Sequence, residues 1–227
     1  QGRLSQVMES NWDNYKPRTD YHFDPFKSDP AYDAMRYVGR FEGDWSEDLA
    51  QTIASSKEIT WRNRNPIDGT SPDIVSEEYD LVRSGADPNL SLTNLEYELL
   101  PVFQRMTDSL CLQEVKKPIQ SRVHVQHPGQ VWNLHIDKLE KWDKDDPHNV
   151  YRFIVMLTDW EPGHFLQYGN FVHTNYRAGE IYGFDWYNVP HCTANAGHTP
   201  RCSMLITGVG SQDTINLFSK YNNIISV

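Results

Sequence analysis

The sequence predicts a mostly β protein, in which an antiparallel sandwich or barrel follows a set of N-terminal helices. From residue 118 onward, short runs rich in β-branched and aromatic residues alternate with turn-forming segments such as HPGQ and YRAGE, which is typical of antiparallel all-β domains. Before that point, apolar residues recur at helical spacing. We therefore expect an arm with supporting helices over residues 1–117 and a β-rich core over residues 118–227, together forming one integrated domain.

Composition narrows the class of protein. The chain has 227 residues, of which 38% are hydrophobic and 12% aromatic, enough to bury a sizeable core. Its net charge is −10 and its Lys and Arg residues are not clustered, which argues against nucleic acid as a partner. No apolar run is long enough to cross a bilayer. Three cysteines without CxxC spacing indicate reduced thiols and a cytoplasmic setting, although Cys192 and Cys202 could meet across a hairpin.

The first half of the core prediction concerns helices. Residues 1–30 read as an extended, irregular arm, and helical spacing runs from about residue 29 to residue 56, most clearly over 46–56 with Ser46 as the N-cap. Residues 60–73 read as a loop. One helical face runs through the segment 91–113, with Pro101 as a kink or boundary. Core packing is the preferred interpretation of its apolar residues, which are Leu92, Leu95, Leu99, Val102, Met106 and Leu110.

The β-rich half consists of short predicted strands. They are expected within residues 119–127, 130–137, 150–160, 169–176, 179–186, 191–196 and 201–209. The segments EPGH (161–164) and AGHTP (196–200) are read as turns between strands. We expect the loop 195–200 to form a hairpin that returns the chain antiparallel.

An ordered set of polar residues within these strands points to a metal site. His135 and Asp137 are two residues apart in a strand-like run, so their side chains point to the same face. His191 opens a later strand, and a barrel brings distant strands together. Two histidines and one carboxylate form the facial triad of non-haem Fe(II) oxygenases, which leaves positions open for a co-substrate and oxygen.

A second pair of residues predicts an anion site at a fixed distance from the metal. Arg201 follows His191 by ten residues, and Ser203 lies two residues further on the same strand face. A buried arginine requires an anion, and its planar guanidinium suits a carboxylate. A serine hydroxyl can add a hydrogen bond to the same group. The combination describes a site for a dicarboxylate that chelates iron at one end.

These motifs resemble those of the 2-oxoglutarate/Fe(II)-dependent oxygenases, over roughly residues 120–210. The segment from Tyr176 to Gly208 is also similar to the C-terminal strands of the aspartyl/asparaginyl β-hydroxylase branch. This chain departs from the best-known members of that branch because Asp137 supplies a carboxylate ligand that they lack. The resemblance implies a double-stranded β-helix, that is, a jelly-roll or cupin-type barrel.

The same resemblance implies an activity and a role for each residue. His135, Asp137 and His191 would hold Fe(II), and Arg201 and Ser203 would bind the 5-carboxylate of 2-oxoglutarate. Arg152 would contact the other end of 2-oxoglutarate. With O2, the enzyme would hydroxylate an amino-acid, peptidyl or other small substrate and release succinate and CO2.

Other interpretations stay open at this point. Each residue alone is more often structural than functional; Arg201, for example, could pair with Asp185. His198 is a weaker alternative to His191 as a ligand. A cupin-like metal enzyme that does not use 2-oxoglutarate is a second hypothesis, with His191 and Asn195 as its motif. A non-catalytic jelly-roll binding module is a third. Residues 57–90 and 143–149 could cover the site. The sequence predicts neither the substrate nor the oligomeric state.

Overall fold

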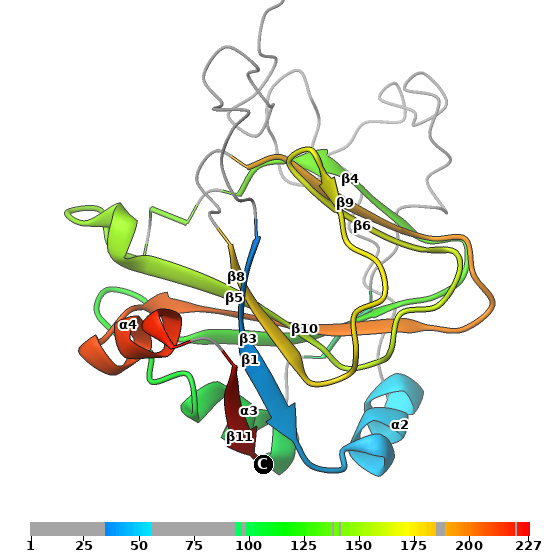
Figure 1. Cartoon of the computed structure of the whole chain (residues 1–227), viewed down its shortest axis with the longest axis horizontal. Helices are drawn as coiled ribbons and strands as arrows, with labels where there is room; N and C mark the ends of the chain where they lie inside the picture. Colours follow the sequence, from blue (N-terminus) through cyan, green and yellow to red (C-terminus); the bar gives the residue numbers. More distant parts are fainter. Residues whose placement is uncertain are drawn as a thin grey trace, which may run out of the picture.

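Two β-sheets face each other in the computed structural model, which describes residues 35–55, 94–96, 99–137, 139–140, 142–184, 189–220 and 222–227. Within these ranges, the side chains of residues 94–96, 133 and 135 lie outside the description. The small sheet (β4, β9, β6 and β7) lies over the inner face of the large sheet, and α2 and α3 lie on the outer side of the large sheet (Figure 1). The prediction of a mostly β protein is confirmed.

The strands are β1 (Met35–Glu42), β2 (Asn94–Glu96), β3 (Gln120–Gln126), β4 (Val131–His135), β5 (Val150–Met156), β6 (His164–Tyr168), β7 (Phe171–Val172), β8 (Glu180–Phe184), β9 (His191–Asn195), β10 (Arg201–Val209) and β11 (Asn223–Ser226). The helices are α2 (Ser46–Ser55), α3 (Pro101–Asp108), the 3-10 turn η4 (Pro147–Asn149) and α4 (Gln212–Ser219). The large sheet has the order β11-β1-β8-β5-β10-β3-β2, and the small sheet the order β4-β9-β6-β7. Between β3 and β10 the chain passes back and forth between the two sheets.

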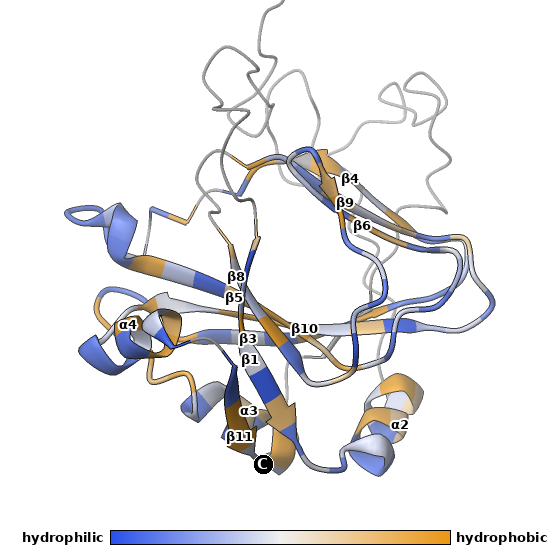
Figure 2. Cartoon of the chain, in the orientation of Figure 1, coloured by the Kyte–Doolittle hydropathy of each residue, from blue (hydrophilic) through white to orange (hydrophobic). Residues whose placement is uncertain are grey.

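Side-chain alternation along the strands separates an outer apolar core from an inner face. On β3, Val123 and Val125 are fully buried in the outer core, where the apolar face of α3 also packs. The intervening residues of β3 therefore point inward, between the sheets. On β5 and β10 the alternation is the same, with Phe153 and Met204 in the outer core. Figure 2 shows hydrophobic and hydrophilic positions mixed along these strands.

The second predicted helical segment is shorter than expected. Helix α3 starts at Pro101, so this proline is a boundary, and its missing N–H costs nothing at the first helical position. Leu95 lies on strand β2, so residues 91–113 do not form one helix. Met106 and Leu110 are fully buried, which confirms the core role of this apolar stripe. Leu92 lies outside the described residues.

The helical prediction for residues 35–42 is wrong, because this segment forms β1. It pairs antiparallel with β8 and parallel with β11. The parallel pairing depends on Gly39, since a Cβ there would lie 2.3 Å from the carbonyl oxygen of Asn223. The part of the chain before residue 118 therefore contributes a strand to the large sheet as well as helices. The expected division at residue 118 stays a prediction.

The helix predicted over 46–56 is confirmed as α2, but its capping differs. Ser46 is the first helical residue and not the N-cap. Its backbone N–H and its hydroxyl donate to Asp44 Oδ1, at 3.0 and 2.7 Å. Asp44 therefore supplies the negative charge that the N-terminus of a helix favours.

Three elements were not expected from the sequence. Strand β6 begins within the segment that was read as the turn EPGH, at His164. Helix α4 starts after Ser211, whose side chain forms a capping box with Thr214. Strand β11 extends the edge of the large sheet. The predicted loop 60–73 lies outside the described residues.

The connection between β9 and β10 is not the expected hairpin. Strand β9 pairs with β4 and β6, and β10 pairs with β3 and β5, so the loop crosses from one sheet to the other. Cys192 and Cys202 consequently lie in different sheets, and both are free thiols, as is Cys111. In the part of the chain that the structure covers, no helix has both the length and the apolar character needed to span a bilayer.

Replacing Phe103 with alanine is expected to lower the free energy of unfolding by about 3–5 kcal/mol, because the fully buried ring would leave a cavity between α3 and the large sheet. Val115→Ala is the control, since Val115 is 54% exposed and should change stability by less than about 0.5 kcal/mol. Urea denaturation measures both. Equal stability of the two variants would show that α3 does not pack as described.

Candidate functional site

Strands β4 and β9 bring the two predicted histidine ligands together in the backbone. They pair antiparallel, and His135 lies opposite His191. Strand β4 ends at His135, so Asp137 follows the strand and does not continue it. The expectation that His135 and Asp137 share one strand face is therefore wrong in detail. The side chain of His135 is outside the described part of the chain.

Asp137 and His191 approach each other through the atoms that a metal would use. Asp137 Oδ2 lies 3.5 Å from His191 Nε2 and 3.1 Å from Arg152 Nη1. All three side chains are largely shielded from solvent, with exposed fractions of 14% or less. Arg152 thus supplies the positive charge beside the Asp137 carboxylate. The predicted contact of Arg152 with 2-oxoglutarate stays a prediction.

The tautomer of His191 follows from its second hydrogen bond. Nδ1 lies 3.0 Å from the carbonyl oxygen of Val189. A carbonyl only accepts, so Nδ1 carries the proton, and in the neutral ring Nε2 presents a lone pair toward Asp137. Two acceptors then face each other, an arrangement that a cation between them stabilises. The ring itself is held by stacking on Tyr168, with centroids 4.7 Å apart and planes 6° from parallel.

The described side chains do not by themselves complete a metal site. Among them, no group of three His, Cys, Asp or Glu residues is arranged to hold a metal. The predicted set has three members, and only Asp137 and His191 have side chains within the description. His198, the weaker alternative ligand, is exposed in the loop after β9.

Arg201 is buried on the inner face of the large sheet, as a residue that binds an anion should be. Only 4% of it is exposed. Its Nε donates to Gln126 Oε1 at 3.0 Å, and its Nη1 has no hydrogen-bond partner among the described residues. Ser203 is 2% exposed and lies two residues further along β10, between Met156 and His124 in the register. A buried guanidinium nitrogen without an acceptor indicates a place for a ligand oxygen.

Two residues that sequence reasoning missed support Arg201. The amide of Gln126 is used at both ends: it accepts from Arg201 and donates to Thr193 Oγ1 on the small sheet at 3.0 Å. The hydroxyl of Tyr176 is buried, and burial raises its pKa while the nearby Arg201 lowers it. A usable signal for Gln126 was the alternation of polar and valine residues in QSRVHVQ. No motif marks Tyr176.

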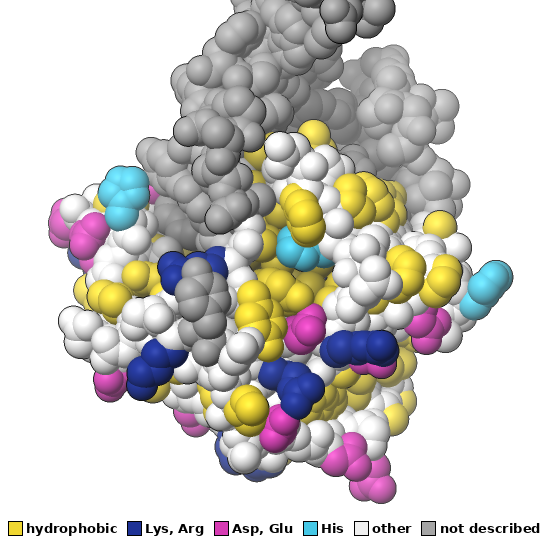
Figure 3. Space-filling view, in the orientation of Figure 1, with side chains coloured by type: hydrophobic (Ala, Val, Ile, Leu, Met, Phe, Trp, Pro, Cys, Tyr) yellow, Lys and Arg dark blue, Asp and Glu magenta, His cyan; other side chains and the backbone are white. Residues whose placement is uncertain are grey.

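His124 shows that the predicted charged residues share one interior. Burial lowers the pKa of His124 to about 3, and the charges of Arg152, Arg122 and Arg201 lower it further, whereas Asp137 raises it. The residues that were predicted to hold a metal and an anion therefore act on one buried imidazole. Figure 3 shows apolar side chains and a histidine at the centre of this face, between the two sheets.

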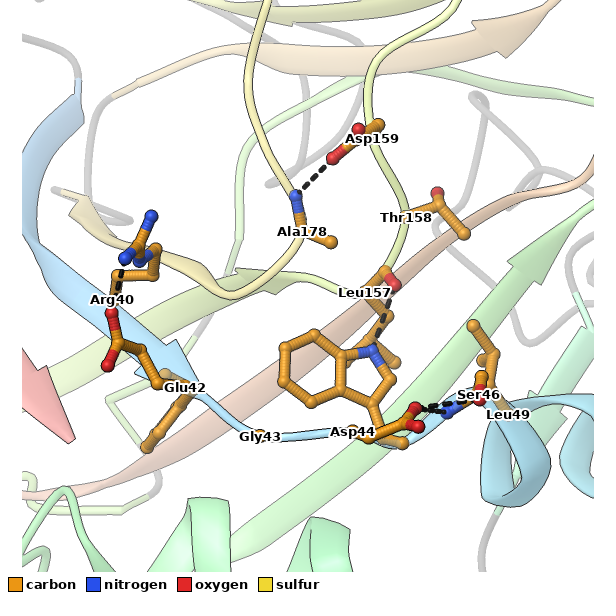
Figure 4. Close-up of a pocket in the computed structure, with 12 residues that line it drawn as sticks. Arg40, Glu42, Gly43, Asp44, Ser46, Leu49, Leu157, Thr158, Asp159 and Ala178 are labelled. Atoms are coloured by element: carbon orange, nitrogen blue, oxygen red, sulfur yellow. Dashed lines mark hydrogen bonds and ion pairs between the residues drawn. The ribbon is translucent and has the colours of Figure 1, made fainter. Parts of the chain in front are cut away.

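A pocket drawn in Figure 4 lies elsewhere, between the end of β1, the start of α2 and the loop after β5. Its volume is about 570 Å³, and none of the predicted site residues lines it. Polar groups around it are satisfied within the protein: Trp45 Nε1 donates to the Leu157 carbonyl at 3.0 Å, and Asp159 Oδ1 accepts from the Ala178 N–H at 2.8 Å. We therefore place the candidate site between the sheets.

Asn195, part of the motif for a cupin-like enzyme, has a structural role. Its Nδ2 donates to the carbonyl oxygens of Gln126 and Thr199, both at 2.8 Å, and its Oδ1 accepts from the Gly197 N–H at 2.9 Å. These bonds fix the crossing from β9 to β10. They leave its side chain committed to the loop. The predicted partner of Arg201, Asp185, lies outside the described residues.

Comparisons with known proteins concern the fold alone. No protein-family model matches the sequence, and no curated protein matches it. Among solved structures, the non-heme alpha-ketoglutarate-dependent epimerase SnoN from nogalamycin biosynthesis is 9% identical, with 77% of each chain covered and a TM-score of 0.49. A prolyl-4-hydroxylase from Pseudomonas putida is 15% identical, with 72% of this chain and 98% of that chain covered and a TM-score of 0.40.

Cupin-type proteins are also among the structural neighbours. A Cupin 2 conserved barrel domain protein from Salinispora arenicola is 13% identical, with 56% of this chain and 82% of that chain covered and a TM-score of 0.30. The neighbours thus include oxygenases and cupins, and at these identities the likeness describes the arrangement of strands. The similarity to the aspartyl/asparaginyl β-hydroxylase branch stays a prediction.

Proposed function

We propose that the protein is a non-haem Fe(II) and 2-oxoglutarate-dependent oxygenase that hydroxylates an amino-acid, peptidyl or other small substrate. One observation carries the proposal: a histidine nitrogen and a carboxylate oxygen face each other at 3.5 Å, and a buried arginine on the same inner face has a nitrogen without a protein partner. The first feature suits a metal and the second suits a carboxylate.

The spacing of the two described ligands fits an octahedral metal. Neighbouring ligands of an octahedron with bonds of about 2.1 Å lie about 3 Å apart, close to the 3.5 Å between Asp137 Oδ2 and His191 Nε2. His135, opposite His191 in the backbone register, would be the third ligand. The bond from His191 Nδ1 to the Val189 carbonyl keeps Nε2 deprotonated for this role.

Iron with bound 2-oxoglutarate and O2 would supply the oxidising chemistry, with succinate and CO2 as products. The protein's part is to bind, orient and exclude water. Arg201 would hold the 5-carboxylate through Nη1, with the hydroxyls of Ser203 and Tyr176 nearby to donate. Buried apolar side chains around His191, such as Tyr168 and Phe184, keep the site dry.

The strand order supports a double-stranded β-helix. Strands β8, β5, β10 and β3 are adjacent in one sheet, and β4, β9, β6 and β7 form the other. Eight strands that alternate between two facing sheets in this way make a jelly roll of two Greek keys. In that fold, β4, β9 and β10 bring His135, His191 and Arg201 toward one interior.

Succinate formation tests the proposed reaction. Purified protein with Fe(II), 2-oxoglutarate and O2 is expected to produce succinate, slowly without substrate and faster with a suitable compound from a panel of amino acids, peptides and small acids. Zn(II) in place of Fe(II) should give none, because zinc has no redox chemistry. Metal-dependent turnover that consumes no 2-oxoglutarate would instead favour the cupin-like enzyme.

Gln126→Glu is expected to weaken 2-oxoglutarate binding about tenfold or more, because a carboxylate at this buried position would pair with Arg201 and compete with the ligand. Gln126→Met is the control: it removes the hydrogen bond without adding charge and should have a smaller effect. Titration calorimetry in the presence of Mn(II) measures both. Equal affinities in the two variants would mean that Gln126 does not govern the charge of Arg201.

A further inference from the structure

Three arginines line the inner face of the large sheet although the chain as a whole is acidic, with a net charge of −10. Arg122 is on β3, Arg152 on β5 and Arg201 on β10, and these are neighbouring strands. On β3 and β5 the residues between them, such as Val123 and Phe153, are buried in the outer core. The arginines therefore point inward by alternation.

The register places two of these arginines together and the third apart. Arg122 lies opposite Leu205 and Arg152 opposite Thr207, whereas Arg201 lies opposite Gln126 at the other end of β10. The two strands that flank β10 are about 10 Å apart, which two arginine side chains can bridge with a small anion between them. Arg152 also contacts Asp137 at 3.1 Å, so this pair is at the metal end of the site.

The proposed cofactors do not use this pair. The charges of Fe(II) and Arg201 balance those of Asp137 and 2-oxoglutarate. Arg122 and Arg152 add positive charge beside the metal, and the described charged groups that act on His124 include a single carboxylate, Asp137. A buried or half-buried cluster of this sign favours an anion, and guanidinium groups suit the planar oxygens of carboxylate and the oxygens of phosphate.

We infer that the substrate carries an anionic group, a carboxylate or a phosphate, which Arg122 and Arg152 hold next to the metal. The inference rests on the proposed function, because it takes Arg201 to be occupied by 2-oxoglutarate. The group so held would fix the substrate's orientation toward the metal. The acidic surface of the chain gives no indication of this preference, since net charge does not describe an interior.

Anion binding to the protein saturated with Mn(II) and 2-oxoglutarate tests the inference. The probes are inorganic phosphate, benzoate and the neutral isostere benzamide, titrated by calorimetry into wild type, Arg122→Gln and Arg105→Gln. Arg105 is an exposed arginine on α3, outside the large sheet, and serves as the matched control. We expect phosphate or benzoate to bind wild type and Arg105→Gln equally, Arg122→Gln about tenfold or more weakly, and benzamide not to bind.

The comparison of phosphate with benzoate identifies the anionic group that the site prefers. Unchanged binding by Arg122→Gln, or benzamide binding as tightly as benzoate, would overturn the inference and leave the oxygenase proposal intact. Failure of 2-oxoglutarate itself to bind would overturn the proposed function instead. The same titrations on the protein with Mn(II) alone would then report on Arg122 directly, with loss of binding in Arg122→Gln supporting an anion site and equal binding opposing it.

Discussion

Replacing Arg201 with methionine is expected to weaken 2-oxoglutarate binding about a hundredfold or more, while the affinity for Mn(II) changes less than about twofold. The guanidinium is 4% exposed and its Nη1 has no partner among the described residues, so the ligand's carboxylate is its expected acceptor. Methionine keeps the length and apolar character of the side chain and removes the charge.

Separate titrations of Mn(II) and of 2-oxoglutarate measure the two affinities. Arg105→Met is the control for loss of an arginine outside the site. A uniform loss of both affinities would point to misfolding, which circular dichroism and thermal unfolding would reveal. Unchanged affinity for 2-oxoglutarate in a folded Arg201→Met protein is incompatible with the assigned role of Arg201.

Asp137→Asn is expected to lower Mn(II) affinity about a hundredfold and to abolish succinate formation. The amide has the shape of the carboxylate but lacks the charge that a divalent cation requires. Asn is preferable to Ala here, because Asp137 is also the ion-pair partner of Arg152 and a complete loss of the side chain would leave that arginine with fewer partners.

A matched change at another acidic residue separates a local from a general effect. Asp159 pairs with the exposed Arg177 at 3.2 Å and lies outside the candidate site, so Asp159→Asn should retain metal binding and turnover. Electron paramagnetic resonance of free Mn(II) counts the metal that remains unbound. Wild-type metal affinity in Asp137→Asn would remove this carboxylate from the ligand set.

The strands were predictable because their local composition agrees with their environment. Runs such as VYRFIVM combine β-branched and aromatic residues, and turn formers separate them, so β5, β8 and β10 follow directly from the sequence. The segment MRYVGRFE misled because its apolar residues also fit a helical spacing. Pairing with β8 and β11 decided its conformation, and those partners lie more than 130 residues away.

Tertiary pairing also explains the error between β9 and β10. A short loop rich in Gly, Pro and Asn is compatible with a hairpin and with a crossing between sheets, and local sequence does not distinguish them. The bonds of Asn195 to Gln126 and Thr199 hold the crossing. These partners are set by the fold, so they could not be read from the loop itself.

The candidate site was predictable where residue type and spacing carry the chemistry. The burial of Arg201 and the approach of Asp137 to His191 agree with expectations drawn from their order in the chain. The contact between Arg152 and Asp137 was not expected, nor were the supporting roles of Gln126 and Tyr176. Such contacts depend on which strands become neighbours, and that information is absent from any short motif.

The dependence of 2-oxoglutarate binding on metal tests the central claim most directly. Calorimetric titration of 2-oxoglutarate should show one site per chain in the presence of Mn(II), and affinity lower by about tenfold or more when the metal is removed with a chelator, because metal and Arg201 would hold opposite ends of the same ligand. Binding of equal strength with and without metal, or no binding in either case, would contradict the account.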